Sequence, residues 1–359
     1  MPGRFRVVDS VVREGRFNIA LDQAMIELHQ AGRIPDTFRF MRFPPTALVG
    51  RHQALSQEVD VPYCRARGVG IVRRITGGGA IYLDEGQLGW GLVFHRRALG
   101  AATLPELARD ICLAVAAGLR RLGVDARYRP RNDIEVDGRK ISGTGGFFDG
   151  ETLIYQGTVL VDMDPAAMVA ALRVPRAKLE KRQLDSAAQR VVTLRELLGP
   201  TTPALPAIQQ ALLEGFAERF EVEWGVESLS AEEEECAWKH YREEIGTEAF
   251  VTGIDDPAHD ADFASGTHAC PGGTITSYLR LEGPGRKRIG QVLITGDFFV
   301  APPRVVLDLE AALRGAYLED VPAVIEQFFG ERPLSALTVT PADFQASLDR
   351  AVAAAAGPP

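Results

Sequence analysis

The sequence predicts an α+β protein in which a mixed sheet flanked by helices is followed by a small C-terminal α/β domain. Three observations support this fold class. Short apolar runs typical of strands occur among long amphipathic helical patterns, a polar segment at 252–266 interrupts this pattern, and the pattern restarts after it. The chain has 359 residues, 46% hydrophobic and 25% charged, which is ordinary for a globular protein with two domains. We therefore expect a large domain at 1–251, a linker at 252–266 and a second domain at 267–359.

The first helix is predicted at 17–30, because Leu21, Ala24, Met25 and Leu28 fall on one helical face. A second helix with the same periodicity is predicted at 104–122, and helices should dominate from 165 to 246. Short apolar runs rich in β-branched and aromatic residues predict strands. These runs lie at 38–43, 47–50, 69–72, 89–94 and 153–163.

The second domain is expected to begin with two strands, at 273–282 and 288–295, followed by a helix at 303–314. A final helix should begin at Thr340 as the N-cap, with Pro341 at the first helical position.

Charge and composition exclude several classes of partner. The net charge of −8 gives no general nucleic-acid footprint, so an anionic substrate would need a local basic pocket. The chain has no apolar stretch long enough to span a membrane and no signal-peptide core at its N-terminus. We therefore expect a cytoplasmic protein that binds neither nucleic acid nor membrane.

A structural zinc site is not expected. The four cysteines show no C-x-x-C spacing, which also argues against a disulfide framework. His52, His95, His240 and His268 do not pair at metal-ligand spacing, so structural roles are expected for them.

Three consecutive glycines, Gly77, Gly78 and Gly79, follow Arg73 and Arg74. The segment is neither a P-loop, because no lysine follows, nor a Rossmann fingerprint, because the spacing is wrong. Glycines allow a ligand to lie directly on the main chain, with N–H groups directed at phosphate oxygens and arginines supplying positive charge. A glycine-rich turn beside a solvated arginine pair explains this segment equally well.

The dipeptide Asp137-Gly138 predicts a two-residue hairpin turn. A regular hairpin would pair residue 135 with 140 and residue 133 with 142, and paired residues share a face of the sheet. The polar residues predicted to share one face are Asp133, Glu135, Lys140 and Ser142. This face could be an exposed polar surface with a Glu135–Lys140 cross-strand ion pair of little energetic value, or a lysine and a carboxylate that converge on a phosphate and its Mg²⁺. The hairpin alone leaves both interpretations open.

Together these segments resemble the lipoate–protein ligase family, whose fold is similar to that of biotin ligases and class II aminoacyl-tRNA synthetase cores. The matching motifs occur in the family's order and extend over about residues 15–250. They are the segments at 18–22, 49–53, 73–84, 131–143 and 156–158. Residues 266–345 in turn resemble the small accessory domain of lipoate ligases. This resemblance rests on the segments at 268–273, 294–299 and 309–315.

The resemblance implies an ATP-dependent ligase that activates lipoate as lipoyl-AMP and transfers it to a lysine of an acceptor protein. Lys140 would be the catalytic residue, stabilising charge in both steps, and Asp133 would hold Mg²⁺. Side chains at 77–79 would fill the space that the acyl-adenylate occupies. The residues implied to bind ATP, lipoate or Mg²⁺ are Arg51, Arg74, Gly77, Gly78, Gly79, Ala80, Ile81, Tyr82, Asp84, Asn132, Asp133, Lys140, Ser142, Gly143, Gly157 and Thr158.

The sequence departs from the family pattern at a few positions. Leu83 replaces the family's usual histidine, Tyr155 and Gln156 replace a pair of histidines, and Gly145 replaces an alanine. These departures bear on acceptor handling rather than on the phosphate-binding set.

Two alternative functions remain. An octanoyl or lipoyl transferase on the same fold would need a cysteine nucleophile, but no cysteine occurs between Cys112 and Cys236, and we interpret both as structural. A non-catalytic lipoate-binding adaptor is the other alternative, and the retention of Lys140, Asp133 and Arg74 argues against it. The acceptor could be a dehydrogenase E2 domain, a glycine-cleavage H protein or a specialised lipoate-binding protein.

Overall fold

The computed structural model describes residues 3–99, 103–130, 132–173, 190–257, 260, 262–332, 335–336 and 339–355. The chain divides into two compact units. The first unit comprises Met1–Leu48, Val59–Arg73 and Ile81–Val251. The second comprises Val49–Glu58, Arg74–Ala80 and Thr252–Pro359, so two short internal segments group with the C-terminal part of the chain.

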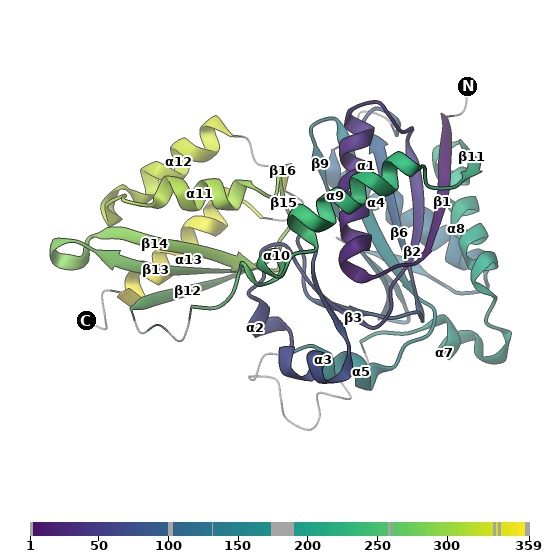
Figure 1. Cartoon of the computed structure of the whole chain (residues 1–359), viewed down its shortest axis with the longest axis horizontal. Helices are drawn as coiled ribbons and strands as arrows, with labels where there is room; N and C mark the ends of the chain where they lie inside the picture. Colours follow the sequence, from purple (N-terminus) through teal and green to yellow (C-terminus); the bar gives the residue numbers. More distant parts are fainter. Residues whose placement is uncertain are drawn as a thin grey trace. The chain divides into compact units, whose positions relative to one another are not determined.

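An eight-stranded mixed sheet forms the centre of the first unit (Figure 1), in the order β11-β1-β2-β6-β10-β9-β8-β7. Strand β1 runs parallel to both β11 and β2, whereas the remaining neighbours are antiparallel. The strands are β1 (Gly3–Val12), β2 (Thr37–Arg42), β6 (Gln87–His95), β7 (Arg127–Arg129), β8 (Asp133–Val136), β9 (Arg139–Asp149), β10 (Thr152–Leu160) and β11 (Val222–Glu227). A smaller sheet has the order β4-β3-β5 and contains β3 (Thr46–Val49), β4 (Gly70–Arg73) and β5 (Ile81–Leu83).

Helices cover both faces of the large sheet. Neighbouring residues of β2 show this, because successive side chains of a strand point to opposite faces. Arg39 forms an ion pair with Asp22 of α1 (Gly15–Gln30), at 2.7 Å, whereas Phe38 packs edge-on against Phe216 of α8 (Leu205–Phe220). Helix α9 (Ala231–His240) packs on α1, and α4 (Leu104–Arg121) packs on α8. The two faces are called the α1 face and the α4 face below.

Shorter helices connect these elements. They are α2 (Leu55–Glu58), α3 (Val61–Arg67), α5 (Pro165–Ala171), α7 (Leu194–Leu198), a 3-10 turn at Gly199–Thr201, a π-helical turn at Tyr241–Ile245 and α10 (Glu248–Thr252). Within the described part of the chain, no helix combines the length and apolar character needed to cross a membrane.

The second unit is built on an antiparallel sheet in the order β12-β13-β14. Its elements are β12 (Phe263–Cys270), β13 (Gly273–Glu282), β14 (Arg288–Gly296), the pair β15 (Val300–Ala301) and β16 (Ser335–Ala336), α11 (Val305–Leu313), α12 (Val321–Glu331), α13 (Pro341–Ala355), and 3-10 turns at Pro284–Arg286 and Leu318–Asp320. Helix α13 packs across β12 and β13, and its Ser347 hydroxyl donates to the Gly266 carbonyl at 3.0 Å. Phe298 and Phe344 meet edge-on in the core of this unit.

The predicted α+β class is confirmed, with a mixed sheet flanked by helices and a second sheet-and-helix unit. Elements that were not predicted include the strands β1, β11 and β12 and the helix α12. Strand β12 begins at Phe263, inside the segment 252–266 that was predicted as a polar linker. The boundaries of a catalytic and an accessory domain stay a prediction.

Candidate functional site

The hairpin formed by β8 and β9 has the predicted turn. Asp137 and Gly138 both have positive φ, at 49° and 76°, as a two-residue hairpin turn of this type requires. Next to the turn, Glu135 pairs with Lys140 as expected. Beyond it the register shifts by one residue, so that Ile134 pairs with Ser142. The irregularity is a β-bulge that adds one residue to β9.

The bulge changes which residues share a face, so the predicted placement of Ser142 was wrong. Ser142 is fully buried opposite the equally buried Ile134, and its hydroxyl has no hydrogen-bond partner among the described residues. Asp133 instead pairs with Gly143. The Lys140 Nζ lies 2.7 Å from Asp133 Oδ1. Lys140, Asp133 and Gly143 therefore come together, and Ser142 points away from them.

Gly143 lies directly beneath the lysine side chain. A Cβ at this position would lie 2.6 Å from both Cε and Nζ of Lys140. The lysine side chain is 40% exposed and that of Asp133 is 24% exposed, so the ion pair remains accessible. An ion pair this exposed adds about 1 kcal/mol or less to stability. The Lys140–Asp133 ion pair therefore contributes little to stability, and its charged groups remain available to a ligand.

The Lys140 group occupies the α1 face of the sheet. Thr144 faces α4, because its Oγ1 lies 3.4 Å from Cys112 Sγ, and Gly143 must face the other way. On the neighbouring strand β10, Gln156 pairs with Gly145 and donates to Asp22 of α1 at 2.6 Å. This contact confirms that alternate residues of β9 and β10 point toward α1.

Asn132 and Gly157 are held by packing around Thr144. The Asn132 side chain donates to the Thr144 carbonyl, and the Thr144 N–H donates to the Asn132 carbonyl at 2.9 Å. A Cβ at Gly157 would lie 2.3 Å from the Trp90 ring, so close packing alone requires a glycine there. Thr158 follows on β10, half-buried and paired with Gly89.

Ile81, Tyr82 and Asp84 lie on or after β5. Ile81 is half-buried and Tyr82 is buried, and burial raises the pKa of the Tyr82 hydroxyl. The Asp84 carboxylate accepts the Gly86 N–H at 2.8 Å and therefore shapes the turn that leads into β6. Burial raises the pKa of Asp84, although the Gly86 hydrogen bond opposes this effect.

The remaining predicted residues belong to the second unit. Arg74 is buried, and its Nη2 donates to the carbonyls of Gly77 and Gly79 at 3.0 and 2.8 Å. Burial lowers the pKa of its guanidinium to about 10, so the group stays protonated at neutral pH. The Arg51 N–H donates to the Thr76 carbonyl at 2.9 Å. Arg74 thus supports the backbone of the glycine loop, defined here as residues 74–80.

The three glycines differ in what they pack against. A Cβ at Gly77 would lie 2.0 Å from the carbonyl oxygen of Phe298, and one at Gly78 would lie 2.5 Å from the Phe299 ring. The Gly78 N–H also donates to the Phe298 carbonyl at 3.2 Å. Only Gly79 faces open space, with no heavy atom within 4 Å of the Cβ position. The structure therefore explains Gly77 and Gly78 by contact with 298–299, a segment about 220 residues away that local sequence patterns do not connect to the loop, and leaves Gly79 toward open space.

The departures from the family pattern have structural roles. The fully buried Tyr155 hydroxyl lies 2.7 Å from Thr144 Oγ1 on the α4 face. The Gln156 amide donates to the buried carboxylate of Asp22. Burial raises the pKa of this carboxyl group, and the positive charge of Arg39 partly opposes that increase. Leu83 is buried. These residues support the sheet where the family pattern has histidines.

None of the four cysteines resembles an activated nucleophile. Cys64 and Cys112 are fully buried, and burial raises the pKa of each thiol to about 11. The Cys112 thiol contacts Thr144 on one face of β9, whereas the Lys140 side chain lies on the opposite face of this strand. Cys236 lies on α9, and Cys270 ends β12 in the second unit.

A family model described as the lipoyl protein ligase A/B catalytic domain matches residues 14–217, which is more than half of the chain. The chain belongs to this family. An octanoyltransferase LipM from Kyrpidia tusciae is 32% identical over 245 residues, which cover 62% of this chain and 89% of that protein. Lipoate-protein ligase A subunit 1 from Thermoplasma acidophilum is 27% identical over 249 residues, covering 67% of this chain and 92% of that subunit. Relatives of both reaction types are therefore similar to this chain.

Solved lipoate ligases share the fold. A bi-partite lipoate protein ligase from T. acidophilum, studied with its E2 lipoyl domain, superposes with a TM-score of 0.62 at 26% identity. The match covers 71% of this chain and 98% of that one. LipL1 from P. falciparum in complex with lipoate gives a TM-score of 0.71 over 90% of this chain and 94% of its own, and its 16% identity supports the fold alone.

Proposed function

We propose that this protein is an ATP-dependent lipoate–protein ligase. In the first step a carboxylate oxygen of lipoate bonds to the α-phosphorus of ATP, and pyrophosphate leaves. In the second step the amine of an acceptor lysine bonds to the acyl carbon, AMP leaves and the amine loses a proton. Both steps develop negative charge on oxygen atoms, so both require fixed positive charge at the reacting group.

The observation that supports this proposal is the placement of Lys140. Its ammonium group is accessible on the α1 face, paired with Asp133 at 2.7 Å. The thiol of Cys112, which contacts Thr144 of β9, is buried on the opposite face of the sheet, and burial raises its pKa to about 11. A thioester exchange needs a thiolate, whereas an adenylation needs a cation. The arrangement around Lys140 favours adenylation.

The residues present suit the substrates ATP and lipoate and the ion Mg²⁺. Lys140 would stabilise the phosphate and the acyl carbonyl in turn, and Asp133 would hold Mg²⁺, for which a carboxylate oxygen is a preferred ligand. When bound, Mg²⁺ would neutralise phosphate charge. Asn132 would orient groups beside Asp133. In the second unit the glycine loop offers the bare backbone of Gly79, and Arg74 keeps that backbone in place.

Incubating the purified protein with ATP, Mg²⁺ and lipoate and measuring pyrophosphate tests the first step. We expect Lys140→Ala to lower pyrophosphate release by about 10²–10³-fold or more with the fold intact, because a pre-organised cation is lost. Lys287→Ala provides the matched control, because it removes an exposed lysine that is outside the predicted site. Normal release from the Lys140 variant would refute the assignment.

A second candidate, octanoyl transfer without ATP, is favoured by the LipM relative at 32% identity. It predicts acyl transfer from an octanoyl thioester on a carrier protein in the absence of ATP. Cys112→Ala separates the two mechanisms, because a ligase should keep its activity in this variant. Loss of transfer by this variant, with its fold retained, would favour the transferase.

The acceptor that we propose is a lipoyl domain of the E2 or H-protein type, or a specialised lipoate-binding protein. The T. acidophilum ligase was studied with an E2 lipoyl domain, which supports the first of these. The mass shift of candidate acceptors after incubation with ATP and lipoate would identify the preferred one.

A further inference from the structure

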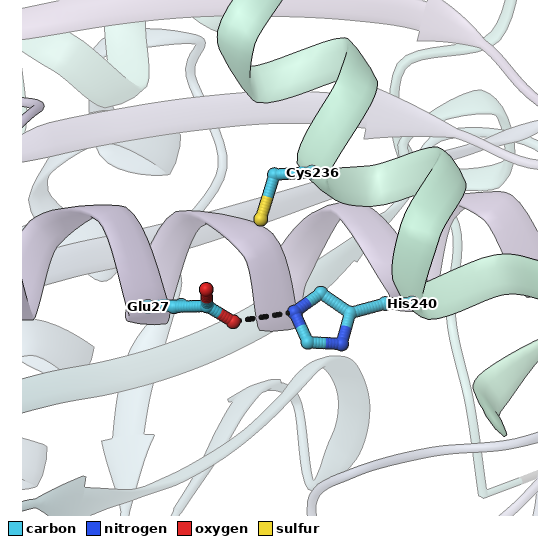
Figure 2. A group of neighbouring side chains, drawn as sticks. All are labelled: Glu27, Cys236 and His240. Carbon is cyan, nitrogen blue, oxygen red and sulfur yellow. Dashed lines mark hydrogen bonds and ion pairs between the residues drawn. The ribbon is translucent and has the colours of Figure 1, made fainter. Parts of the chain in front are cut away.

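A second group of chemically reactive side chains lies apart from the Lys140 group, where α9 crosses α1. Glu27 of α1 and Cys236 and His240 of α9 point toward one another (Figure 2). One oxygen of Glu27, the Cys236 sulfur and one ring nitrogen of His240 all lie within 4.8 Å of one another. The Glu27 Oε2 and the His240 Nε2 are 2.8 Å apart.

The helices place these groups by simple geometry. Cys236 and His240 are four residues apart on α9, so their side chains lie one turn apart on the same face. The two helices also meet through an aromatic contact, since Phe17 of α1 packs against Trp238 of α9 at a ring distance of 4.5 Å. Glu27, in the last two turns of α1, completes the group from across the interface. The sequence has neither paired histidines nor a C-x-x-C motif here, and only a cysteine and a histidine four residues apart mark the site.

The three ligand atoms are typical of a metal ion that is intermediate between hard and soft, such as zinc. A thiolate, an imidazole and a carboxylate are the three ligand types that zinc uses in proteins, and three protein ligands leave one position for water. Calcium and magnesium prefer oxygen ligands throughout and would not select this set. We propose that Glu27, Cys236 and His240 form a zinc-binding site that joins α9 to α1.

Binding needs only small side-chain movements. Zinc lies about 2.3 Å from sulfur and about 2.0 Å from nitrogen or oxygen, so the ligand atoms of a tetrahedral site are roughly 3.3–3.7 Å apart. The Glu27–His240 contact of 2.8 Å must widen slightly, and the present hydrogen bond is replaced by two metal bonds. The Cys236 thiol gives up its proton to bind the metal, so zinc binding releases at least one proton. The Glu27 side chain is 49% exposed and that of His240 17%, which leaves a path for the ion to enter.

Bound zinc would hold together two helices from distant parts of the sequence. Helix α9 leads through the π-helical turn to α10, the last helix of the first unit. Metal binding to the folded state alone should raise the unfolding temperature in proportion to the logarithm of the free zinc concentration.

The experiment uses the full-length protein, stripped with a chelator and checked by circular dichroism. Titration with Co²⁺ should give the absorption bands of a tetrahedral site with a thiolate-to-cobalt transition, at one ion per chain, and Zn²⁺ should abolish them. Zinc affinity, measured by competition with a chromophoric chelator, should fall about 100-fold or more in Cys236→Ser and His240→Gln, and less in Glu27→Gln.

Matched variants remove the same chemical groups from other places. Cys270→Ser removes another half-buried thiol, and Glu235→Gln removes an exposed carboxylate of the same helix. Both should bind zinc as tightly as the unmodified protein. The proposal is overturned if Cys236→Ser binds zinc with unchanged affinity, or if the cobalt complex shows no thiolate transition.

Discussion

Gly143 shows how one missing side chain can position a charged group. A Cβ at this position would lie 2.6 Å from the end of the Lys140 side chain, and the lysine now reaches across this space to Asp133. The obstruction would fall on a flexible side chain rather than on the backbone. A larger residue would therefore displace the ammonium group before it disturbed the sheet.

We predict that Gly143→Ala lowers ligase turnover by about 10-fold or more, because a catalytic group displaced by about 1 Å loses much of its effect. The temperature of unfolding should change little. Steady-state kinetics and thermal unfolding of the same preparation check this. Full turnover in the alanine variant would mean that the position of Lys140 beside Asp133 is not important for the reaction.

Glu310 predicts a pH dependence of stability in the second unit. This buried side chain accepts the Ile294 N–H at 2.7 Å, and burial raises the pKa of its carboxyl to about 7. Between its ordinary pKa and about 7 the folded state binds more protons than the unfolded state, so stability falls as the pH rises through this window. The loss is on the order of 3 kcal/mol for this group, at about 1.4 kcal/mol per pKa unit.

Thermal unfolding from pH 5 to 8 should therefore show a falling unfolding temperature for the second unit. Glu310→Gln keeps an acceptor oxygen but cannot ionise, and it should flatten the curve. Some slope should remain from Glu58, because burial also raises the pKa of its carboxyl to about 7. A variant that unfolds with the same pH profile as the unmodified protein would rule out Glu310 as the cause.

Among the secondary-structure elements, α4 and α8 are in close contact through two glycines. A Cβ at Gly118 would lie 2.6 Å from the Ala211 carbonyl oxygen, and one at Gly215 would lie 2.3 Å from the Ala114 carbonyl oxygen. The backbones of the two helices thus approach closely at Gly118 and at Gly215, because neither glycine has a side chain to separate them. Because these neighbours are backbone atoms, they cannot move aside without shifting a whole helix.

We predict that Gly118→Val destabilises the protein by about 1–3 kcal/mol or more, because overpacking forces the helices apart. Chemical denaturation measures this directly. The matched control is Gly330→Ala in α12, where no atom lies within 4 Å of the Cβ position and alanine should be neutral or stabilising by up to about 1 kcal/mol. Equal stabilities for both variants would show that α4 and α8 do not pack as described.

Periodicity and turn chemistry predicted the local elements well. The helix expected at 104–122 is α4, Leu104–Arg121, and the strands expected in the second domain match β13 and β14 closely. Strand β11 was missed because its partner β1 lies about 220 residues away in sequence, and β1 itself pairs with both β11 and β2. The bulge in β9 was missed because a two-residue turn fixes the register only beside the turn. The shared face of Lys140 and Asp133 was predicted, although the cross-strand ion pair considered for Lys140 was with Glu135. The contact of the glycine loop with Phe298 and Phe299 was not predicted, since only the tertiary fold brings these segments together.

At the scale of the whole molecule, the second unit combines the glycine loop with the C-terminal part of the chain. The glycine loop and the segment at 49–58 group with the C-terminal part of the chain, and the Gly78 N–H donates to the Phe298 carbonyl at 3.2 Å. Gly296 N–H donates to the His52 carbonyl at 3.0 Å, and the His52 and Phe298 rings stack. The loop that we propose for nucleotide and acyl binding therefore depends on residues beyond 252 for its support.

We predict that ending the chain near residue 255 lowers formation of lipoyl-AMP much more than transfer from preformed lipoyl-AMP, because adenylation needs fixed charges and an ordered loop. Phe299→Ala tests the same contact without truncation, since the Phe299 ring lies against Gly78, and should show a milder form of the same defect. Assaying the two steps separately checks both variants. Full adenylation by the truncated protein would show that residues beyond 255 are dispensable.

The covalent continuity between the glycine loop and Phe298 has a consequence for enzymology at low concentration. Both segments belong to one polypeptide, so their encounter is intramolecular, with an effective concentration that does not change on dilution. An assembly of separate chains would lose this contact once its subunits were diluted below their dissociation constant. Specific activity should therefore be the same at nanomolar and micromolar enzyme, and no imbalance in the synthesis of two subunits can leave the loop without its support.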